Sequence, residues 1–393
     1  MRIGIYGGSF NPPHCAHLRA ADIFGKEEKL DRLLIIPTYT APHKAMSSDD
    51  PGPEERLLLC RLLFARLPGA EVSDLEARRG GRSYTADTIR QLRKQYPDDE
   101  LLFLMGTDML LTFTEWYDYR YLLDNLSLVV LPRERGREAE LASAAQALQR
   151  DCGARVRILK EDPMPMASTD IRTELKNRRG MQELTDEVYS HIIKNRLYGS
   201  RPDFAWLREK AYAMLKPTRV KHVQGVEAQA VRLARRWGGD EERAAEAGIL
   251  HDITKKLSLK EQLILCGKYD IICDNLELEN EKLLHAKTGA AVAEDLFGAD
   301  PQVRSAVRWH TTGRPAMSQL EKIIYLADYI EPTRDFEGID ELRRLCDENL
   351  DAAMELGLRM SIEDVRANGR EVHPDSIRAW NYYRHAVRQA AEK

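Results

Sequence analysis

The chain has 393 residues, of which 43% are hydrophobic and 31% are charged, and its formal net charge at pH 7 is −4. This length predicts two or three domains, and the composition is typical of folded globular proteins and excludes a largely disordered chain. The small net charge favours neither a nucleic acid nor an anionic membrane as the main partner.

The cysteines and the opening residues indicate the cellular location. Six cysteines are scattered along the chain without a C-x-x-C pair, which is typical of reduced thiols in the cytosol. The first residues lack a positive region followed by an apolar core, so we expect no signal peptide. No segment approaches the roughly 18 apolar residues of a membrane span. We therefore predict a cytoplasmic protein. The sequence does not determine the oligomeric state, and a homo-oligomer is one of the open alternatives.

The first part of the chain alternates short apolar runs with longer amphipathic stretches. Strands that alternate with helices predict an α/β domain in which helices cover both faces of a parallel sheet. The predicted strands are Ile3–Tyr6, Leu33–Ile36, Leu101–Met105, Leu128–Leu131 and Val156–Leu159.

The first predicted strand leads into the sequence GGSFNPPHCAH, residues 7–17, and then into a predicted helix. Glycines let the backbone approach phosphates closely, and the first turn of a helix presents unpaired N–H groups to an anion. His14 and His17 lie three residues apart, so both imidazoles can stabilise charge on the same phosphoryl or adenylyl group. A glycine pair alone is as typical of a structural turn, but the complete string is more specific.

That string resembles the signature G-x-F-[DN]-P-x-H-x-G-H of nucleotidyltransferases of the HxGH class. Ala16 stands where this family usually has glycine. The resemblance implies a Rossmann-like domain that binds ATP at the loop, with His14 and His17 as the catalytic residues. The implied ATP contacts within the string are Gly7, Gly8, Ser9, Phe10, His14 and His17.

Later stretches resemble one branch of that class. The motifs PHK (42–44), RSYT (82–85), GTD (106–108) and TEWY (114–117) occur in an order similar to nicotinate-mononucleotide adenylyltransferase. The motif STDIR (168–172) resembles that family's second nucleotide signature, S-x-x-x-[IV]-R, and the resemblance covers residues 1–198. It implies further ATP contacts from Lys44, Ser168, Thr169 and Arg172. For the mononucleotide it implies contacts from Tyr84, Thr85, Asp108, Trp116 and Tyr117.

The chemistry of these side chains agrees with the implied roles. Trp116 offers a flat apolar face for a pyridine ring, and Thr85 with nearby N–H groups could hold a carboxylate. Asp108, after a strand, could accept a ribose hydroxyl, and Arg172, at a helix start, suits phosphate oxygens. Simpler interpretations stay open: Trp116 as a packing residue, Asp108 as a helix cap and His43 as an ordinary loop histidine.

The reaction implied is attack of the mononucleotide phosphate on the α-phosphorus of ATP, with release of pyrophosphate. It needs no protein nucleophile, so catalysis consists of positioning and charge stabilisation, with Mg²⁺ carried on the triphosphate. Two other acceptors stay open, namely phosphopantetheine and nicotinamide mononucleotide.

The tract GSRPD, residues 199–203, breaks the alternating pattern with Gly, Ser and Pro and is predicted to be a linker. We therefore expect one domain at 1–198 and a second at 204–393. In the second, helical periodicity dominates, for example in EAQAVRLARRW and HAKTGAAVAEDLF, and no convincing strand is evident. This part is predicted to be all-α.

A set of spaced histidines and aspartates marks the second domain. Adjacent His251 and Asp252, at the end of an apolar helix, can direct an imidazole and a carboxylate to one centre. Such ligands suit Fe, Mn, Zn or Co, and the lack of nearby thiols disfavours a closed structural zinc site. A lone His-Asp pair would be ordinary, whereas spaced elements in a helical context are not. The candidate metal ligands are His222, His251, Asp252, His285, His310 and Asp328.

This pattern resembles the HD-domain phosphohydrolases that hold two metals. The resemblance implies that Asp252 bridges two ions, with His222, His251 and Asp328 on one and His285 and His310 on the other. Two such ions can activate water and clamp a phosphate. Catalysis would centre on Asp252.

The flanking sequences HDITK (251–255), HTTGRP (310–315) and DYIEP (328–332) look like the HD-type symmetrical diadenosine tetraphosphate hydrolase over about residues 205–385. That implies cleavage into two ADP at a pair of transition-metal ions, with iron first and Mn, Co or Zn as alternatives. Lys255 and Arg314 become candidate phosphate contacts, although either could be a solvated charge. His373 and His385 lie outside the pattern and are expected not to be ligands, and His191 is expected to be structural.

The sequence thus predicts a bifunctional enzyme whose partners are ATP, nicotinate mononucleotide and diadenosine tetraphosphate. The alternative is that the second domain only senses adenylates as a regulator, without turnover. Retention of all six ligand-type residues argues against that alternative.

Overall fold

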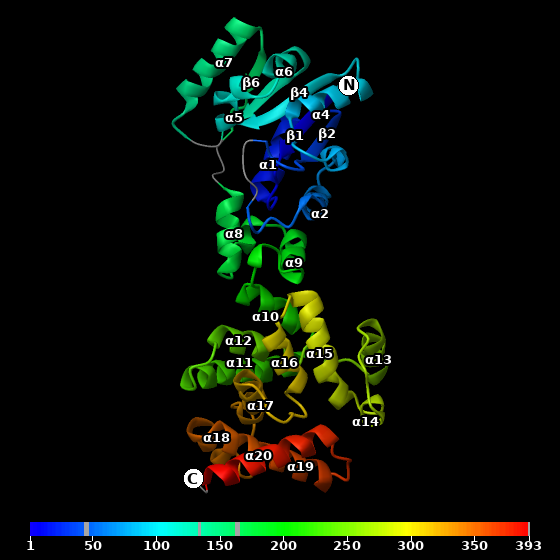
Figure 1. Ribbon diagram of the computed structural model, residues 1–393, viewed down its shortest axis with the longest axis vertical. Helices are drawn as coiled ribbons and strands as arrows, with labels where there is room; N and C mark the ends of the chain where they lie inside the picture. The colour runs from blue at the N-terminus through cyan, green and yellow to red at the C-terminus, as the bar shows by residue number, and fades with distance from the viewer. Residues whose placement is uncertain (43–46, 133–134, 162–165, 392–393) are drawn as a thin grey trace. The chain divides into compact units, whose positions relative to one another are not determined.

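The computed structural model describes residues 1–42, 47–132, 135–161 and 166–391. Lys44 and His43, both named above, lie outside the described residues. The chain divides into two compact units, Met1–Arg201 and Pro202–Lys393 (Figure 1). No helix in the described part is both long and apolar enough to cross a membrane.

The first unit is built on a six-stranded parallel sheet with the order β3-β2-β1-β4-β5-β6. All five strands predicted from the apolar runs are confirmed. They extend over β1 (Arg2–Gly8), β2 (Arg32–Pro37), β4 (Glu100–Gly106), β5 (Ser127–Leu131) and β6 (Arg155–Ile158). The α/β prediction is therefore confirmed as well.

One strand escaped the sequence analysis. The edge strand β3 (Ala70–Val72) has only three residues, and none of them is fully buried. An edge strand this short carries neither an apolar run nor a readable alternation, so its pairing with β2 depends on the neighbouring strand rather than on its own pattern.

The strand order places the ligand-binding edge of this sheet. The chain proceeds outward from β1 to β2 and β3, then returns to the other side of β1 for β4, β5 and β6. The connections therefore diverge between β1 and β4, and ligands of open α/β sheets bind beyond the carboxyl ends of the strands at such a point. Both the Gly7-Gly8 pair and Gly106 lie at these carboxyl ends.

Helices surround the sheet in the first unit. Leu30 and Phe24 pack directly on the backbone of β1 at Gly4, because an added Cβ there would lie 2.3 Å from Leu30 Cδ1 and 2.8 Å from Phe24 Cε1. The helices are α1 (Cys15–Glu27), α2 (Pro53–Phe64), α3 (Leu75–Arg79), α4 (Thr85–Gln95), α5 (Thr107–Leu111), α6 (Tyr119–Asn125), α7 (Glu138–Cys152), α8 (Ser168–Lys176) and α9 (Asp186–Lys194). Short 3-10 turns follow at η1 (Phe113–Glu115), η2 (Met181–Glu183) and η3 (Leu197–Gly199).

The tract 199–203 contains the boundary between the two units, after Arg201. Two hydrogen bonds attach this tract to the first unit. The Ser200 hydroxyl donates to the Ile192 carbonyl, and the Arg201 N–H donates to the Leu175 carbonyl. At the other end, the Asp203 carboxylate accepts from two backbone N–H groups and caps the helix α10 (Phe204–Ala213).

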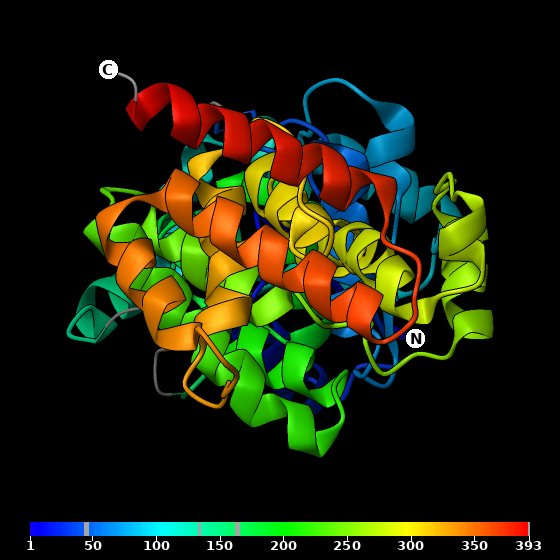
Figure 2. The same ribbon diagram turned by 90° about the horizontal axis from the view of Figure 1, so that it is seen from below.

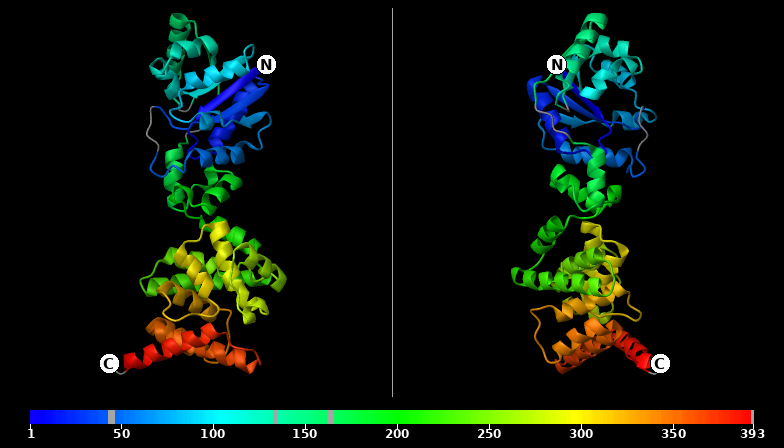
Figure 3. Two further views of the ribbon diagram at one scale, coloured as in Figure 1. Left: turned by 45° about the vertical axis from the view of Figure 1, so that its right-hand side comes forward. Right: turned by 90° about the vertical axis from the view of Figure 1, so that its left-hand side faces the viewer.

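The second unit is all-helical in its described residues, which confirms the predicted class (Figures 2 and 3). Asp240, Ser258, Asp300 and Ser318 each cap a helix by accepting a backbone N–H. The helices are α10 (Phe204–Ala213), α11 (Pro217–Arg236), α12 (Glu241–Leu250), α13 (Leu259–Lys268), α14 (Asn275–Leu278), α15 (Glu281–Phe297), α16 (Pro301–Trp309), α17 (Gln319–Ile330), α18 (Ile339–Glu348), α19 (Leu350–Ala367) and α20 (Pro374–Ala391).

Candidate functional sites

The glycine loop after β1 brings the two predicted histidines together. His14 is the N-cap residue of α1, and its backbone N–H donates to Nδ1 of His17 over 3.2 Å. The two imidazole rings have centroids 3.7 Å apart. Because Nδ1 of His17 accepts a hydrogen bond, its ring proton is on Nε2, which makes Nε2 a donor suited to a phosphate oxygen.

Two arginines hold the carbonyls of this loop, and one of them was missed in the sequence. Arg56 of α2 is fully buried, and its Nη1 donates to the carbonyls of Ser9 (2.9 Å) and Thr38 (2.6 Å). Its Nη2 donates to the Tyr39 carbonyl over 2.9 Å, and its Nε pairs with Asp50 over 3.0 Å. An arginine within a helix is typical of a solvated charge, so no sequence signal identified Arg56.

Arg172 is the second of these arginines, and its position corrects an expectation. It lies in the second turn of α8, not at the helix start. Its Nη1 donates to the Asn11 carbonyl over 2.6 Å, and its Nε lies 3.3 Å from the Asp49 carboxylate. Ser168, at the helix start, donates its hydroxyl to the Pro12 carbonyl. The second signature therefore packs directly on the glycine loop.

A cavity of about 1090 Å³ opens at the carboxyl edge of the sheet. It is larger than the usual range of small-molecule pockets, roughly 300–1,000 Å³, so it has room for two nucleotides. Every site residue predicted for the first domain lines it, apart from Lys44 outside the described residues: Gly7, Gly8, Ser9, Phe10, His14, His17, Tyr84, Thr85, Asp108, Trp116, Tyr117, Ser168, Thr169 and Arg172. Ala16, the departure from the signature, lines it as well.

The aromatic part of the cavity lies beyond the ends of β4. Trp116 is half-buried and packs edge-to-face on Phe103, with ring centroids 6.1 Å apart, and it also contacts Phe113. It therefore packs in the core and lines the cavity at the same time. Tyr84 and the exposed Tyr117 form a tilted pair with centroids 4.9 Å apart.

Thr85 and Asp108 both lie in the first turn of a helix. Thr85 is the first residue of α4, and Asp108 is the second residue of α5. Unpaired N–H groups at such helix starts favour an anion, which suits a carboxylate or phosphate near Thr85. The N-cap position of α5 is occupied by Gly106 and not by Asp108, so the helix-cap alternative lacks support.

A buried carboxyl supports the wall beside Thr85. Glu76 of α3 accepts from the Thr88 hydroxyl over 2.5 Å, and Ser83 bonds it as well. The Ser83 Oγ in turn accepts from the Tyr39 N–H. Burial raises the pKa of the Glu76 carboxyl above its ordinary value, despite these donors.

The predicted metal ligands of the second unit come from three helices and from the residues that directly follow two others. His222 lies in α11, His285 in α15 and Asp328 in α17. His251 and Asp252 directly follow α12, and His310 follows α16. Gly248 lets α11 and α12 come this close, because an added Cβ would lie 2.8 Å from the Glu227 Cα.

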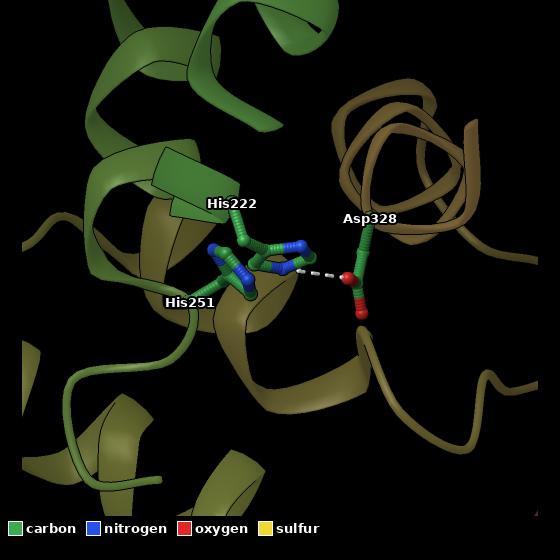
Figure 4. Close-up of side chains that lie close together, drawn as sticks. All are labelled: His222, His251 and Asp328. Carbon is green, nitrogen blue, oxygen red and sulfur yellow. Dashed lines mark ion pairs between the residues drawn. The ribbon is translucent and has the colours of Figure 1, made fainter. Parts of the chain in front are cut away.

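These ligands form two sets whose donor atoms lie within 4.8 Å of one another: His222, His251 and Asp328, and then Asp252, His285 and His310. Figure 4 shows the first set, in which Nε2 of His222 lies 3.0 Å from the Asp328 carboxylate. The fully buried Asp252 lies between the sets. Its Oδ1 is 3.2 Å from His285 Nε2, and its Oδ2 is 3.4 Å from His251 Nε2.

The hydrogen bonds of the imidazoles fit metal binding. Nδ1 of His251, His285 and His310 each lies 2.7 Å from a backbone carbonyl and must donate to it, so each Nε2 carries a lone pair. The Nε2 atoms of His285 and His310 face each other at 3.0 Å. Two lone pairs at that distance repel unless they share a cation, so the donor set fits a divalent metal ion.

Glu331 supports the fourth histidine and was not identified in the sequence analysis. Its carboxylate lies 3.0 Å from Nδ1 of His222, the arrangement by which carboxylates orient metal-binding imidazoles. Gly225 leaves room for it, because an added Cβ would lie 2.8 Å from Glu331 Oε2. The signal was present in the DYIEP motif, but only the fold brings Glu331 to His222.

The electrostatics of this centre keep Asp252 and His285 in the ligand form. Burial raises the pKa of the Asp252 carboxyl, but His251, Lys255 and His285 outweigh burial and hold this pKa well below its usual range. Burial and the nearby Lys255 lower the pKa of His285 to about 3, so its imidazole is neutral at pH 7.

The two predicted phosphate contacts differ. Lys255 Nζ lies 3.3 Å from Asp252 Oδ1, at the metal ligands. Arg314, by contrast, directs Nε and Nη2 at the buried carboxylate of Glu321, at 3.0–3.2 Å. A buried acid thus engages the Arg314 guanidinium while 37% of the side chain stays exposed, and its contact with phosphate stays a prediction.

Within the described ranges, the remaining histidines have ion-pair or hydrogen-bond partners. A third group that could hold an ion is formed by Asp274, Glu277 and His373. Nδ1 of His373 accepts from the Asp375 N–H, so Nε2 carries the proton and donates to Asp274 over 2.9 Å. Lys287 pairs with Glu277. These bonds satisfy the group without a metal. His191 pairs with Glu55, and His385 bonds Gln389.

The fold and these two sites define the class: a nucleotidyltransferase domain followed by a metal-binding hydrolase domain of HD type. Family models agree, since residues 5–174 match the "Cytidylyltransferase-like" model and residues 219–333 match the "HD domain" model.

Relatives narrow the class. A protein of Geobacter sulfurreducens named "Probable nicotinate-nucleotide adenylyltransferase" is 37% identical over 213 residues, which are 50% of this chain and 98% of the relative. A Mycoplasma genitalium protein named "Probable nicotinate-nucleotide adenylyltransferase/Ap4A hydrolase" is 28% identical over 91% of this chain and 97% of the relative. The chain belongs to the nicotinate-nucleotide adenylyltransferase family, and it carries an HD domain in addition. Both resemblances seen in the motifs are thereby confirmed.

One of the similar solved structures covers about half of the chain. It is described as a predicted HD superfamily hydrolase involved in NAD metabolism from Clostridium acetobutylicum. It is 38% identical, covers 48% of this chain and 100% of its own, and has a TM-score of 0.46.

Proposed function

We propose that the chain catalyses two reactions. In the first, ATP and nicotinate mononucleotide give deamido-NAD and pyrophosphate. In the second, diadenosine tetraphosphate and water give two ADP. We further propose that residues 1–198 perform the first and residues 204–393 the second, with 199–203 between them. The name of the Mycoplasma relative, which covers both parts of the chain, supports this pairing.

The observation that carries the first reaction is the His14–His17 pair on the glycine loop, at one end of a cavity with room for two nucleotides. The mononucleotide phosphate would attack the α-phosphorus of ATP, and the bond to the pyrophosphate leaving group would break. Nε2 of His17 would donate to the phosphate whose charge grows in the transition state. Mg²⁺ would arrive with the triphosphate.

The acceptor half of the cavity favours nicotinate mononucleotide. The start of α4 at Thr85 presents backbone N–H groups to the pyridine carboxylate, and Trp116 and the Tyr84–Tyr117 pair offer faces for the ring. Asp108 would accept a ribose hydroxyl. Nicotinamide mononucleotide and phosphopantetheine are the competing acceptors, and neither has a carboxylate for those N–H groups.

The observation that carries the second reaction is the pair of ligand sets that share Asp252. His222, His251 and Asp328 would hold one ion, and His285 and His310 the other, with Asp252 bridging the two. When bound, such a metal pair supplies an activated water and neutralises phosphate charge. Iron is the first candidate, with manganese, cobalt and zinc as alternatives. A regulator that only senses adenylates would not need two complete sets.

The test uses the full chain. The protein is incubated with Mg²⁺ and ATP plus each of the three acceptors, and separately with diadenosine tetraphosphate after loading with Fe²⁺, Mn²⁺, Co²⁺ or Zn²⁺. Products are separated by chromatography. Deamido-NAD from nicotinate mononucleotide, and ADP from the tetraphosphate, are expected. Binding of the tetraphosphate without turnover with any of these metals would instead support the regulator.

A further inference from the structure

Two arginines that the proposed function has not used point at the metal-binding carboxylates. Arg219, in the first turn of α11, directs Nε and Nη2 at Asp252 Oδ2, at 2.7 and 2.5 Å. Its Nη2 also lies 4.0 Å from the Asp328 carboxylate. Arg334, which follows α17, places its Nη2 3.0 Å from Asp328 Oδ1. Neither arginine was singled out in the sequence.

These cations lie on one side of the centre, and Lys255 lies on the other. Asp252 Oδ2 and Asp328, which the arginines contact, face the set formed with His222 and His251. Lys255 approaches Asp252 Oδ1 and lies 3.3 Å from Nε2 of His285, which belongs to the other set. The first ligand set therefore has two arginines beside it, and the second has Lys255.

The three side chains are partly exposed, although the Nη2 atom of Arg219 is itself buried. Their exposed fractions are 26% for Arg219, 33% for Lys255 and 39% for Arg334, whereas Asp252 is fully buried. Once metals compensate the carboxylates, these three charges are available to a polyphosphate.

We propose that Arg219 and Arg334 on one side, and Lys255 on the other, hold the phosphates that flank the scissile bond of a dinucleoside polyphosphate. This inference rests on the proposed hydrolase function and deepens it. A tetraphosphate chain has two phosphates on either side of its central P–O–P bond. Cations beside both ligand sets centre the chain, so that water attacks an inner phosphorus, the central bond breaks and each half leaves as ADP.

The proposal predicts a change of products as well as of affinity. Without the cations of one side, the chain can shift by one phosphate relative to the metals. Hydrolysis of diadenosine tetraphosphate by one water then gives AMP and ATP instead of two ADP. A residue that merely stabilised the fold would lower turnover but would not move the position of the cut.

The experiment compares Arg219→Gln and Arg334→Gln with the matched control Arg243→Gln. Arg243 is 35% exposed and pairs with Asp300 and Asp240 in the same unit. Each metal-loaded protein is titrated calorimetrically with ADP and with a methylene-bridged analogue of diadenosine tetraphosphate. Products from the hydrolysable compound are separated by chromatography, metal content is measured by elemental analysis, and folding is checked by circular dichroism.

Loss of one charge-assisted contact is expected to weaken analogue binding by about tenfold or more. AMP and ATP should appear, with metal content and the Arg243→Gln control unchanged. The variant Arg334→Lys should retain part of the affinity, because it keeps the charge. Unchanged affinity with ADP as the sole product would overturn the proposal, and so would loss of metal from the glutamine variants.

The two proposals fail differently. If the wild-type protein does not hydrolyse the tetraphosphate, the proposed hydrolase function is wrong, while ADP affinity in the arginine variants still decides whether these residues hold phosphates. If the wild-type protein and both variants release only ADP, and the variants bind the analogue with wild-type affinity, the hydrolase function is supported. The proposal that the arginines hold phosphates is then wrong.

Discussion

Replacing Arg56 with lysine should damage the adenylyl transfer and leave hydrolysis intact. The guanidinium is fully buried and reaches three carbonyls, those of Ser9, Thr38 and Tyr39, in addition to the Asp50 carboxylate. Ser9 belongs to the glycine loop, and the other two carbonyls follow β2. A lysine keeps the charge but replaces the planar guanidinium, with its several fixed N–H donors, by one compact ammonium group.

The magnitude follows from the hydrogen bonds that a lysine cannot make. An ammonium group near Asp50 can satisfy that carboxylate and at most one or two of the three carbonyls. At least one buried acceptor, and up to two, would then lack a donor, each at roughly 1–3 kcal/mol. We expect the first unit to lose about 1–6 kcal/mol of unfolding free energy. The released Ser9 carbonyl also loosens the loop, and a displacement of about 1 Å can cost on the order of 10²-fold in rate.

The assay measures both reactions on the same preparation, so that hydrolysis of diadenosine tetraphosphate reports an intact second unit. Arg66→Lys is the matched control, because Arg66 follows the same helix, is 76% exposed and pairs only at the surface with Glu187. Thermal unfolding is followed alongside. The reasoning is refuted if Arg56→Lys transfers adenylyl groups at the wild-type rate, or if hydrolysis falls in parallel with transfer.

Four further outcomes are expected. His17→Ala should lower adenylyl transfer by about 3 kcal/mol of transition-state stabilisation and spare hydrolysis, whereas Asp252→Ala should do the reverse; loss of both activities in a folded variant would show that the sites are coupled. Trp116→Ala should raise the KM for nicotinate mononucleotide by the equivalent of about 1–3 kcal/mol, with the KM for ATP nearly unchanged; a change in the ATP constant alone would contradict the stacking role. Elemental analysis of protein purified with and without oxygen should find two transition-metal ions per chain, and their removal by a chelator should lower the Tm; fewer than one ion with hydrolysis intact would contradict the two-ion centre. The pKa of Glu76 is raised in the folded state above its ordinary 4.5, so its contribution to the free energy of unfolding is greatest below pH 4.5 and is lost as pH rises through the folded pKa. The variant Glu76→Gln should lack this pH-dependent contribution; if its unfolding free energy has the same pH dependence as the wild type, the role given to Glu76 is wrong.

Local sequence patterns were sufficient for the fold class and for most of the site chemistry. Apolar runs revealed five strands because a buried parallel strand needs a continuous apolar segment, which is a property of the strand itself. The glycine loop with His14 and His17 was readable for a similar reason, since its parts are adjacent in the chain. The spacing of His222 through Asp328 indicated a metal centre, and the fold gathers those six residues into two sets.

Pairings between distant residues could only come from the tertiary structure. The motifs predicted Arg172 and Arg314 as phosphate contacts, but only the fold shows that Arg172 also bonds the Asn11 carbonyl and that Arg314 bonds the buried Glu321. A charged side chain carries no local mark of whether its partner is water, a carbonyl or a buried acid, because that partner belongs to another element of the fold.

The same limit applies to the supports of both sites. Nothing near Arg56 in the chain shows that its guanidinium lies beneath the glycine loop, and nothing near Glu331 shows that it orients His222. Likewise, Arg219 differs from other surface arginines only because α11 brings it to Asp252. The sequence by itself determined which chemistry the chain carries, since motifs record adjacent reactive groups. The tertiary structure decided which side chains hold those groups in place, since that depends on distances set by packing between separate helices and strands.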